Sequence, residues 1–441
     1  MTSRQVILNY RAMAGLYTLS ASLIWGVNTL FLLEAGLDIL GVFIANATFT
    51  ASMALFEIPT GVVADTVGRR LSFLLSIVIV FVGTLGYVGI SVVGGGLFLF
   101  CAMSVLLGLG YTFYSGAVEA WLVDALKATG FDGQLDRVFA RSSMVTGAAM
   151  LIGTVGGGLL GSLDLAWPFL LRSGLLLILF IIAFLTMHDL GFPRRPLSFS
   201  ALPEEMRLVT QTSIVYGWQR GSVRLLMIAS FFHWGFLSWG FYAWQPYFLD
   251  LLGRNAVWVA GLIAALISLS TMAGNTLVEW FARYCGRRTT LLLWAAGIQA
   301  VAAVGVGLAG SFWLAVALFL LVAICMGVTG PVKQAYLHQV VPSEHRATVI
   351  SFDSMIGSGG SAAGQVGLGY VSRAHSIPLG YVVGGLATLG MLPALRILRG
   401  LGESADVIVG TAGHKGSCAA QGLPSVTSID TVLAKPLEVR S

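Results

Sequence analysis

The chain has 441 residues, of which 56% are hydrophobic and only 10% are charged, and its mean hydropathy is +0.85. Because soluble domains carry about 25% charged residues, this composition excludes an ordinary soluble globule and predicts a polytopic membrane protein. The net charge of +5 comes without a run of five or six basic residues. We therefore expect no nucleic-acid partner, and we take the cations as signals of orientation in a membrane.

A bilayer core about 30 Å thick needs about 20 apolar residues for each helical crossing, and the sequence offers twelve such spans. The first half contributes 12–35, 39–63, 71–93, 96–123, 139–163 and 167–188, and the second half contributes 223–249, 256–281, 289–309, 312–339, 347–371 and 378–398. We expect an all-α membrane protein with an N-terminal six-helix bundle (1–188), a cytoplasmic linker (189–222), a C-terminal six-helix bundle (223–399) and a cytoplasmic disordered tail (400–441).

The basic residues predict the orientation. With the N-terminus inside, the cytoplasmic segments and tails hold 21 of the 25 Lys and Arg residues. This bias places both termini in the cytoplasm and the chain in the cytoplasmic membrane. The start "MTSRQVILNYRAMAG" lacks a small-residue cleavage site, so we expect no removable signal peptide.

Motifs for soluble chemistry are missing from the sequence. It has no GxxxxGK[ST] loop, no HExxH pair and no cluster of Cys and His. We expect no enzymatic activity, no cofactor and no metal.

The two halves resemble each other. "GVVADTVGRR" at 61–70 aligns with "EWFARYCGRR" at 279–288, and "GTVGGG" at 153–158 aligns with "GQVGLG" at 364–369. Two matches at similar offsets indicate a duplicated six-helix unit. Parallel repeats with a site at their interface are an architecture of transporters.

The loop at 61–70 resembles the loop signature of the major facilitator superfamily, and the segment 330–355 looks like the tenth and eleventh helices of its bacterial drug-exporter-like members. The resemblance covers 12–399 and implies two pseudo-symmetric six-helix bundles that work by alternating access. It makes the loop a cytoplasmic gate, in which Asp124 is a partner for Arg69; the alternative is arginines that only anchor to lipid. The gate residues would be Gly61, Asp65, Gly68, Arg69, Arg70 and Asp124.

The fifth span resembles the motif that antiporters of this superfamily carry. Gly153, Gly157 and Gly158 match the motif, while Thr154 stands where proline is expected. The alternative is that the glycines only allow close helix packing.

Glu119 is the candidate for proton coupling. With Ser104, Gly108, Tyr111 and Ser115 it recurs at spacings of three or four, which predicts one shared helix face. By resemblance, the first, fourth, seventh and tenth helices line the central cavity. A carboxyl there can load and release a proton, although a structural carboxylate remains the alternative.

The cavity is expected to hold polar and aromatic side chains, since aromatic rings stack with flat or cationic substrates. The candidates for substrate binding are Trp25, Asn28, Tyr111, Ser115, His233, Trp234, Trp239, Tyr242, Lys333 and Gln334. Lys333 would bind an anionic group, a carboxylate such as Glu119, or a structural partner. Of the other polar residues in the spans, we expect Asp353 to suit the N-terminal end of its helix, Arg172 to reach a membrane interface, and Gln245 with Pro246 to mark a helix break.

Three functions remain open. The leading hypothesis is a monomeric secondary transporter that exports amphipathic small molecules in exchange for protons. The alternatives are an uptake or facilitated-diffusion carrier for a small metabolite, and a non-transporting membrane sensor or scaffold. The expected partners are a small-molecule substrate, protons and the lipid bilayer.

Overall fold

The computed structural model describes residues 1–115, 117–192, 207, 211, 213–253, 256–342 and 345–408, without the side chains of Asp65 and Ala347. The first half contains α1 (Ser3–Ser22), α2 (Asn28–Glu34), α3 (Ile39–Thr66), α4 (Arg69–Val93), α5 (Leu97–Tyr114), α6 (Ala117–Ala128), α7 (Leu135–Gly161) and α8 (Trp167–Thr186). The second half contains η1 (Ser213–Trp218), α10 (Gly221–Leu252), α11 (Val257–Cys285), α12 (Arg288–Leu308), α13 (Phe312–Val340), α14 (Arg346–Ala374), α15 (Ile377–Thr388), α16 (Met391–Gly400) and η3 (Ser404–Asp406).

The helices confirm the all-α membrane fold. Ten stretches of the described chain are long and apolar enough to cross a membrane, and two of them join α5 to α6 and α15 to α16. The other two expected spans are α1 with α2, which carries arginines in its first turns, and α14, which is rich in Gly and Ser. Their polar composition lowers their hydropathy, yet both pack against neighbouring helices.

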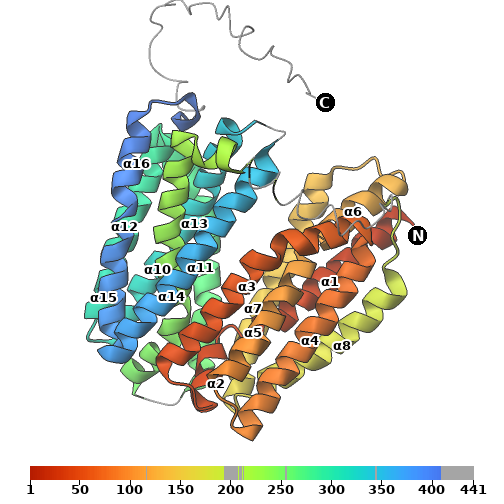
Figure 1. Ribbon diagram of the computed structural model, residues 1–441, viewed down its shortest axis with the longest axis horizontal. Coiled ribbons are helices and arrows are strands. Elements are labelled where there is room, and N and C mark those ends of the chain that lie inside the picture. Colours follow the sequence, from red (N-terminus) through yellow and green to blue (C-terminus); the bar gives the residue numbers. More distant parts are fainter. Residues whose placement is uncertain are drawn as a thin grey trace, which may run out of the picture.

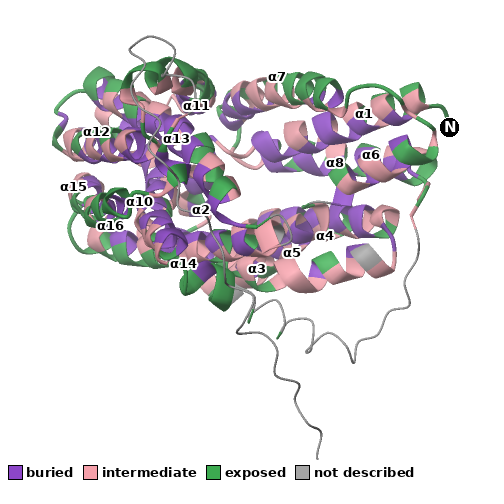
Figure 2. Ribbon diagram, turned by 90° about the horizontal axis from the view of Figure 1, so that it is seen from above, coloured by how far each residue is buried: buried purple, intermediate pink, exposed green. Residues whose placement is uncertain are grey.

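The helices form two bundles that lie side by side, α1–α8 and α10–α16 (Figure 1). Across the boundary, α3 packs against α14 and α7 packs against α11. Buried residues gather on the faces that helices turn toward one another, whereas much of the outward face of α7 is exposed (Figure 2). The core is thus divided between the halves.

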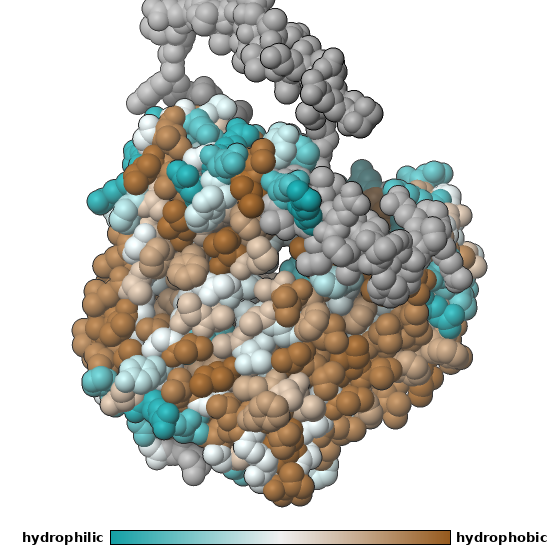
Figure 3. All heavy atoms as spheres, in the orientation of Figure 1, coloured by the Kyte–Doolittle hydropathy of each residue, from teal (hydrophilic) through white to brown (hydrophobic). Residues whose placement is uncertain are grey.

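A broad hydrophobic surface covers the face of the molecule drawn in Figure 3. Figure 3 shows apolar residues over the middle of both bundles and hydrophilic residues gathered toward the ends. Large hydrophobic side chains exposed on the surface of the protein include Phe98, Val301, Trp313 and Tyr370. Such a surface suits lipid, because soluble proteins rarely expose a contiguous apolar patch of this extent.

The halves are joined on the side opposite the N-terminus. Gln245 lies at this junction: its Oε1 accepts a hydrogen bond from the Thr29 backbone nitrogen (2.9 Å), and its Nε2 donates one to the Trp25 carbonyl (2.8 Å). An ion pair joins Arg373 to Asp38 at 2.9 Å. The expected helix break at Gln245 and Pro246 is wrong, because α10 continues through both residues and uses Gln245 to hold the other half.

Glycines bring α7 into backbone contact with two helices. A Cβ atom added at Gly153 would lie 2.9 Å from the carbonyl oxygen of Leu19 in α1, and one added at Gly157 would overlap that of Leu23. At Gly158 the added atom would lie 2.6 Å from the Cα atom of Gly261 in α11. The glycines therefore occupy close-packing positions, both within the first half and between the halves.

The start of the predicted disordered tail is folded. Residues 404–406 form η3, and the Ile408 backbone nitrogen bonds the Gly286 carbonyl at 3.0 Å. The tail beyond residue 408, and residues 193–206, 208–210 and 212 of the predicted linker, lie outside the described residues.

We expect Gly157→Ala to destabilise the protein by about 1–3 kcal/mol, because the added methyl group forces α7 away from α1. Gly156→Ala is the matched control, since the nearest atom to its added Cβ is Leu23 Cδ2 at 4.0 Å. Thermal unfolding followed by tryptophan fluorescence in detergent measures the difference. Equal unfolding temperatures for the two variants would contradict the close contact.

Candidate functional site

Two cavities lie at the boundary between the halves. The first, which we call the lysine cavity, has a volume of about 430 Å³ and is formed mainly by α10, α13 and α14. Its lining includes the predicted residues Trp234, Lys333 and Gln334, together with Asp353 and, from the first half, Thr50. The lysine cavity therefore lies mostly in the second half.

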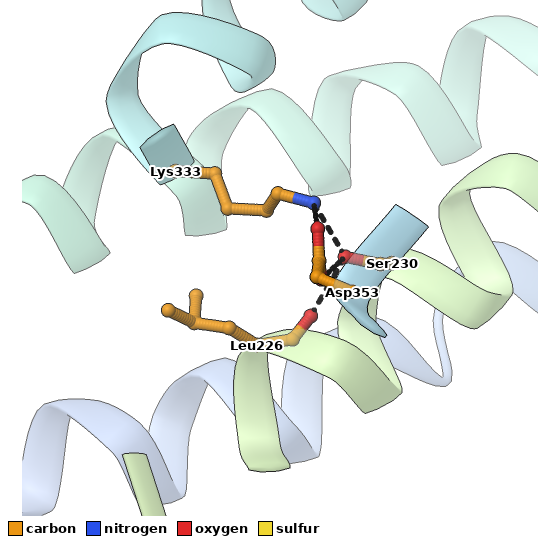
Figure 4. Close-up of polar contacts among 4 residues, drawn as sticks. All are labelled: Leu226, Ser230, Lys333 and Asp353. Carbon is orange, nitrogen blue, oxygen red and sulfur yellow. Dashed lines mark hydrogen bonds and ion pairs between the residues drawn. The ribbon is translucent and has the colours of Figure 1, made fainter. Parts of the chain in front are cut away.

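Lys333 and Asp353 form an ion pair in this cavity (Figure 4). The Lys333 Nζ atom is 2.5 Å from Asp353 Oδ2 and donates to Ser230 Oγ at 2.7 Å. Ser230 Oγ in turn reaches Asp353 Oδ1 (2.8 Å) and the Leu226 carbonyl (3.0 Å), and its single proton serves one of them at a time. Asp353 lies in the second turn of α14, so its carboxylate neutralises Lys333 instead of serving the helix end as expected.

His233 lies beside this pair. It lines a smaller cavity of about 120 Å³ with Ser230 and Lys333. Its imidazole is buried, and its Nδ1 atom has no hydrogen-bond partner among the described residues. His233 thus lies beside the ion pair but does not line the lysine cavity.

The second cavity, which we call the arginine cavity, has a volume of about 310 Å³. It is lined by the predicted residues Trp25, Asn28, Tyr111 and Tyr242, and also by Ile24, Asn46, Phe49, Met53, Tyr87, Leu107, Arg172 and Phe241. Only Phe241 and Tyr242 of this lining come from the second half. The arginine cavity therefore belongs to the first half and is closed by α10.

Arg172 is the functional candidate that sequence reasoning missed. It was expected to reach a membrane interface, but only 2% of its surface is exposed. Its Nη2 atom donates to the Tyr111 hydroxyl at 3.4 Å, and its guanidinium carbon lies 5.9 Å from the centre of the Tyr111 ring. The available signal was its place inside a span, since ionisable residues at membrane depth are functional candidates.

The fourth span does not present one continuous face. α5 ends at Tyr114 and α6 begins at Ala117, and the Ser115 backbone is non-helical. Ser104 bonds Tyr87 at 2.6 Å, and Gly108 packs against α3. The prediction of a shared face is wrong, because a helical period holds only while the helix continues.

Glu119 and Ser115 are exposed, and neither lines the two cavities. Glu119 lies in the first turn of α6, near Tyr10 and Tyr114. Trp239 is fully buried in the second-half core, where it packs against Phe43 and Tyr381. The coupling role of Glu119 stays a prediction.

The predicted gate loop is tied to its own half. The Arg70 backbone nitrogen donates to Asp189 Oδ1 at 2.9 Å, and its guanidinium donates to the Phe184 carbonyl at 2.7 Å. Gly68 has φ +129°, a conformation that favours glycine, and it packs against the Asp189 carboxylate. Asp189 thus caps α4, a role that the sequence did not reveal.

The remaining gate candidates lie near this loop. The Arg69 guanidinium lies 5.6 Å from the centre of the Phe192 ring. The Asp124 carbonyl contacts Gly191, and a Cβ atom at Gly61 would meet nothing within 4 Å. The gate itself stays a prediction, and the Asp65 side chain lies outside the described part.

The second half repeats the cap. Asp406 Oδ1 accepts a hydrogen bond from the Thr289 backbone nitrogen at 2.7 Å, at the start of α12. Arg288, which aligns with Arg70, donates to the Ala405 carbonyl at 2.6 Å. In each half, the segment that follows the last helix carries an aspartate. This aspartate caps the third membrane span of the half, α4 in the first and α12 in the second. The internal repeat is therefore visible in side-chain contacts as well as in helix order.

The search for metal ligands is negative within the described residues: they contain no group of three His, Cys, Asp or Glu side chains that could hold a metal ion.

Comparison with known proteins agrees with this architecture. The sequence matches the family model described as "Major Facilitator Superfamily" over residues 12–365 and 257–415. It is 23% identical over 392 residues to "Uncharacterized MFS-type transporter YxaM" of Bacillus subtilis (strain 168), covering 86% of this chain and 91% of that protein.

Solved structures of transporters have the same fold. The nucleoside transporter NupG superposes with a TM-score of 0.75 at 11% identity, covering 89% of this chain and 99% of that one. The human organic anion transporter MFSD10 gives 0.60 at 17% identity (90% and 100% covered), and a D-xylose-proton symporter gives 0.62 at 14% (90% and 97%). At such low identities these likenesses establish the fold alone. With the family match over most of its length and two six-helix halves, the chain is a member of the Major Facilitator Superfamily.

Proposed function

We propose that this protein is a proton-coupled secondary transporter that works by alternating access, with its N-terminal side in the cytoplasm. Its family membership and fold support transport by a membrane protein. The contacts that join the halves, such as Asp38 with Arg373, lie on the side opposite the N-terminus. In this orientation the present conformation is closed to the outside.

The orientation is supported by a basic groove at the N-terminal side. Four arginines, Arg4 and Arg11 of α1 and Arg137 and Arg141 of α7, line a groove of about 550 Å³. Positively charged residues accumulate on the cytoplasmic side of membrane proteins. The four arginines therefore support an orientation in which the groove lies in the cytoplasm, beside the anionic inner leaflet.

The Lys333–Asp353 pair is the observation that carries the proposal of proton coupling. The two side chains are only 17% and 9% exposed, and they line a cavity at the boundary that must rearrange. Protonation of Asp353 removes its charge and leaves Lys333 without its counterion. Because a lone buried cation is costly, the proton changes the relative stability of the two conformations.

Glu119 is a second coupling candidate. Export of amphipathic molecules was the expectation from the fifth-span motif, but its glycines serve helix packing, and Thr154 bonds within α7. A carrier or symporter is thus an equal alternative.

Alternating access predicts that a disulfide across the closed side traps the protein. A Cβ atom at Gly369 in α14 would lie 2.9 Å from the Phe43 Cβ atom in α3, so cysteines at both positions are close enough to bond after a small shift. In a variant without native cysteines, we expect Phe43→Cys with Gly369→Cys to cross-link on oxidation. Hydrogen exchange in peptides covering 25–45 and 239–261 should then slow, and reduction should restore it.

Each single-cysteine variant controls for the substitutions. Identical exchange in the oxidised and reduced double variant would contradict alternating access, since a molecule that never opens outward has no opening to suppress.

Proton coupling predicts a loss of gradient-driven transport in Asp353→Asn. We expect purified wild-type protein in liposomes to accumulate solutes from a mixed panel of organic acids, amines, nucleosides and sugars when a pH gradient is imposed. Asp353→Asn should abolish accumulation but retain exchange of labelled for unlabelled solute, because binding and rocking do not need the proton. The direction of the pH gradient that drives accumulation shows whether the protein is a symporter or an antiporter.

Glu119→Gln tests the second coupling candidate in the same assay, since it neutralises an exposed carboxyl outside the cavities; we expect it to accumulate solute as the wild type does. Loss of accumulation in Glu119→Gln with full activity in Asp353→Asn would reverse the assignment. Absence of flux for every solute would favour the sensor or scaffold.

A further inference from the structure

We propose that the substrate is a small organic anion with an apolar, flat body, and that Arg172 binds its negative group in the arginine cavity. This inference rests on the proposed transport function and names the substrate class that the function leaves open.

Arg172 is a buried cation that forms no ion pair with any described residue. Only 2% of its surface is exposed, and its described contacts are with the Tyr111 hydroxyl and ring. Its Nε atom has no hydrogen-bond partner among the described residues. A guanidinium keeps its proton in proteins, so this charge cannot be removed by deprotonation.

The cavity around Arg172 has donors to spare and no acid. None of its lining residues is Asp or Glu. The Asn28 amide donates to Asn46 Oδ1 at 3.2 Å. The Nδ2 atom of Asn46 is buried and has no hydrogen-bond partner among the described residues. Asn46 of α3 and Arg172 of α8, which each have a hydrogen-bond donor without a described partner, therefore line the same cavity. A carboxylate satisfies both kinds of donor, because it is acceptor-only and matches the fork of arginine.

The two cavities differ in electrostatics. In the lysine cavity, Asp353 already balances the charge of Lys333. In the arginine cavity, a bound anion would supply the missing balance, and a cation would meet repulsion. Of the flat or cationic substrates that the aromatic residues allowed at the sequence level, this site thus favours a flat one and disfavours a cation.

The walls define the rest of the ligand. Aromatic rings of Trp25, Phe49, Tyr87, Phe241 and Tyr242 line a cavity of about 310 Å³, which suits a compact ring system. Phe241 and Tyr242 come from α10, so a ligand held by Arg172 touches both halves. Its binding is therefore sensitive to the rocking motion.

The test compares matched ligands that differ in charge. Thermal unfolding and titration calorimetry of the purified protein would use benzoate, cinnamate and indole-3-acetate, each beside its neutral amide, with benzamidine as the cation. We expect at least one acid to raise the unfolding temperature while its amide and benzamidine do not. Arg172→Gln should weaken binding of that acid by about tenfold to hundredfold.

Two further variants complete the test. Arg172→Lys should retain part of the affinity because it keeps the charge, which separates charge from folding defects. Arg141→Gln, an exposed arginine of the basic groove, should bind as the wild type does. The inference is overturned if no acid binds, if an amide binds as well as its acid, or if Arg172→Gln is unaffected.

The assay also separates this inference from the proposed function, since binding is measured without a gradient. A protein that binds acids through Arg172 but moves none across liposomes would overturn transport and keep the inference. A protein that transports only amines or neutral solutes would overturn the inference and keep the transport function.

Discussion

Backbone contact at two consecutive glycines of α7 sets the geometry of the closed side. Gly157 meets Leu23 within the first half, and Gly158 meets Gly261 in the second. Successive residues of a helix point about 100° apart, so one helix can touch both neighbours at the same level. The polar contacts around Gln245 form at this same closed end, where the halves are close enough for a side chain to bridge them. In the proposed alternating-access mechanism, opening of this side separates the α7–α11 contact while the α1–α7 contact is kept.

The interior accepts charge in two different ways. The second half holds Lys333 with its own carboxylate, and the first half holds Arg172 against a tyrosine. Since water is scarce at this depth, an unpaired charge raises the energy of whichever conformation buries it most. In the mechanism that we propose, one half responds to protons and the other to a bound anion, and both responses meet at the boundary between the bundles.

The sequence predicted much of the fold and part of the site. Hydropathy and charge bias determine spans in a bilayer, so the two six-helix halves followed directly. Trp25, Asn28, Tyr111, Tyr242, Trp234, Lys333 and Gln334 line cavities as expected. By resemblance, the helices that carry these residues were expected to line the central cavity. The shared face predicted for the fourth span is wrong, because the break at Ser115 carries no hydropathy signal.

The charged residues were harder to predict, because their roles depend on helix packing. Asp353 pairs with a lysine 20 residues away in another helix. Arg172 is buried because α8 turns it toward Tyr111, which period and composition do not specify. Asp189 was placed in a linker, although its carboxylate caps a helix 119 positions earlier in the chain.

The paired caps have a consequence for biosynthesis. Asp189 joins the end of the first half to α4, and Asp406 joins the end of the second half to α12. All the residues that close the first bundle have therefore been synthesised before α10 begins. The first half can therefore form this closing contact while the ribosome is still making the second.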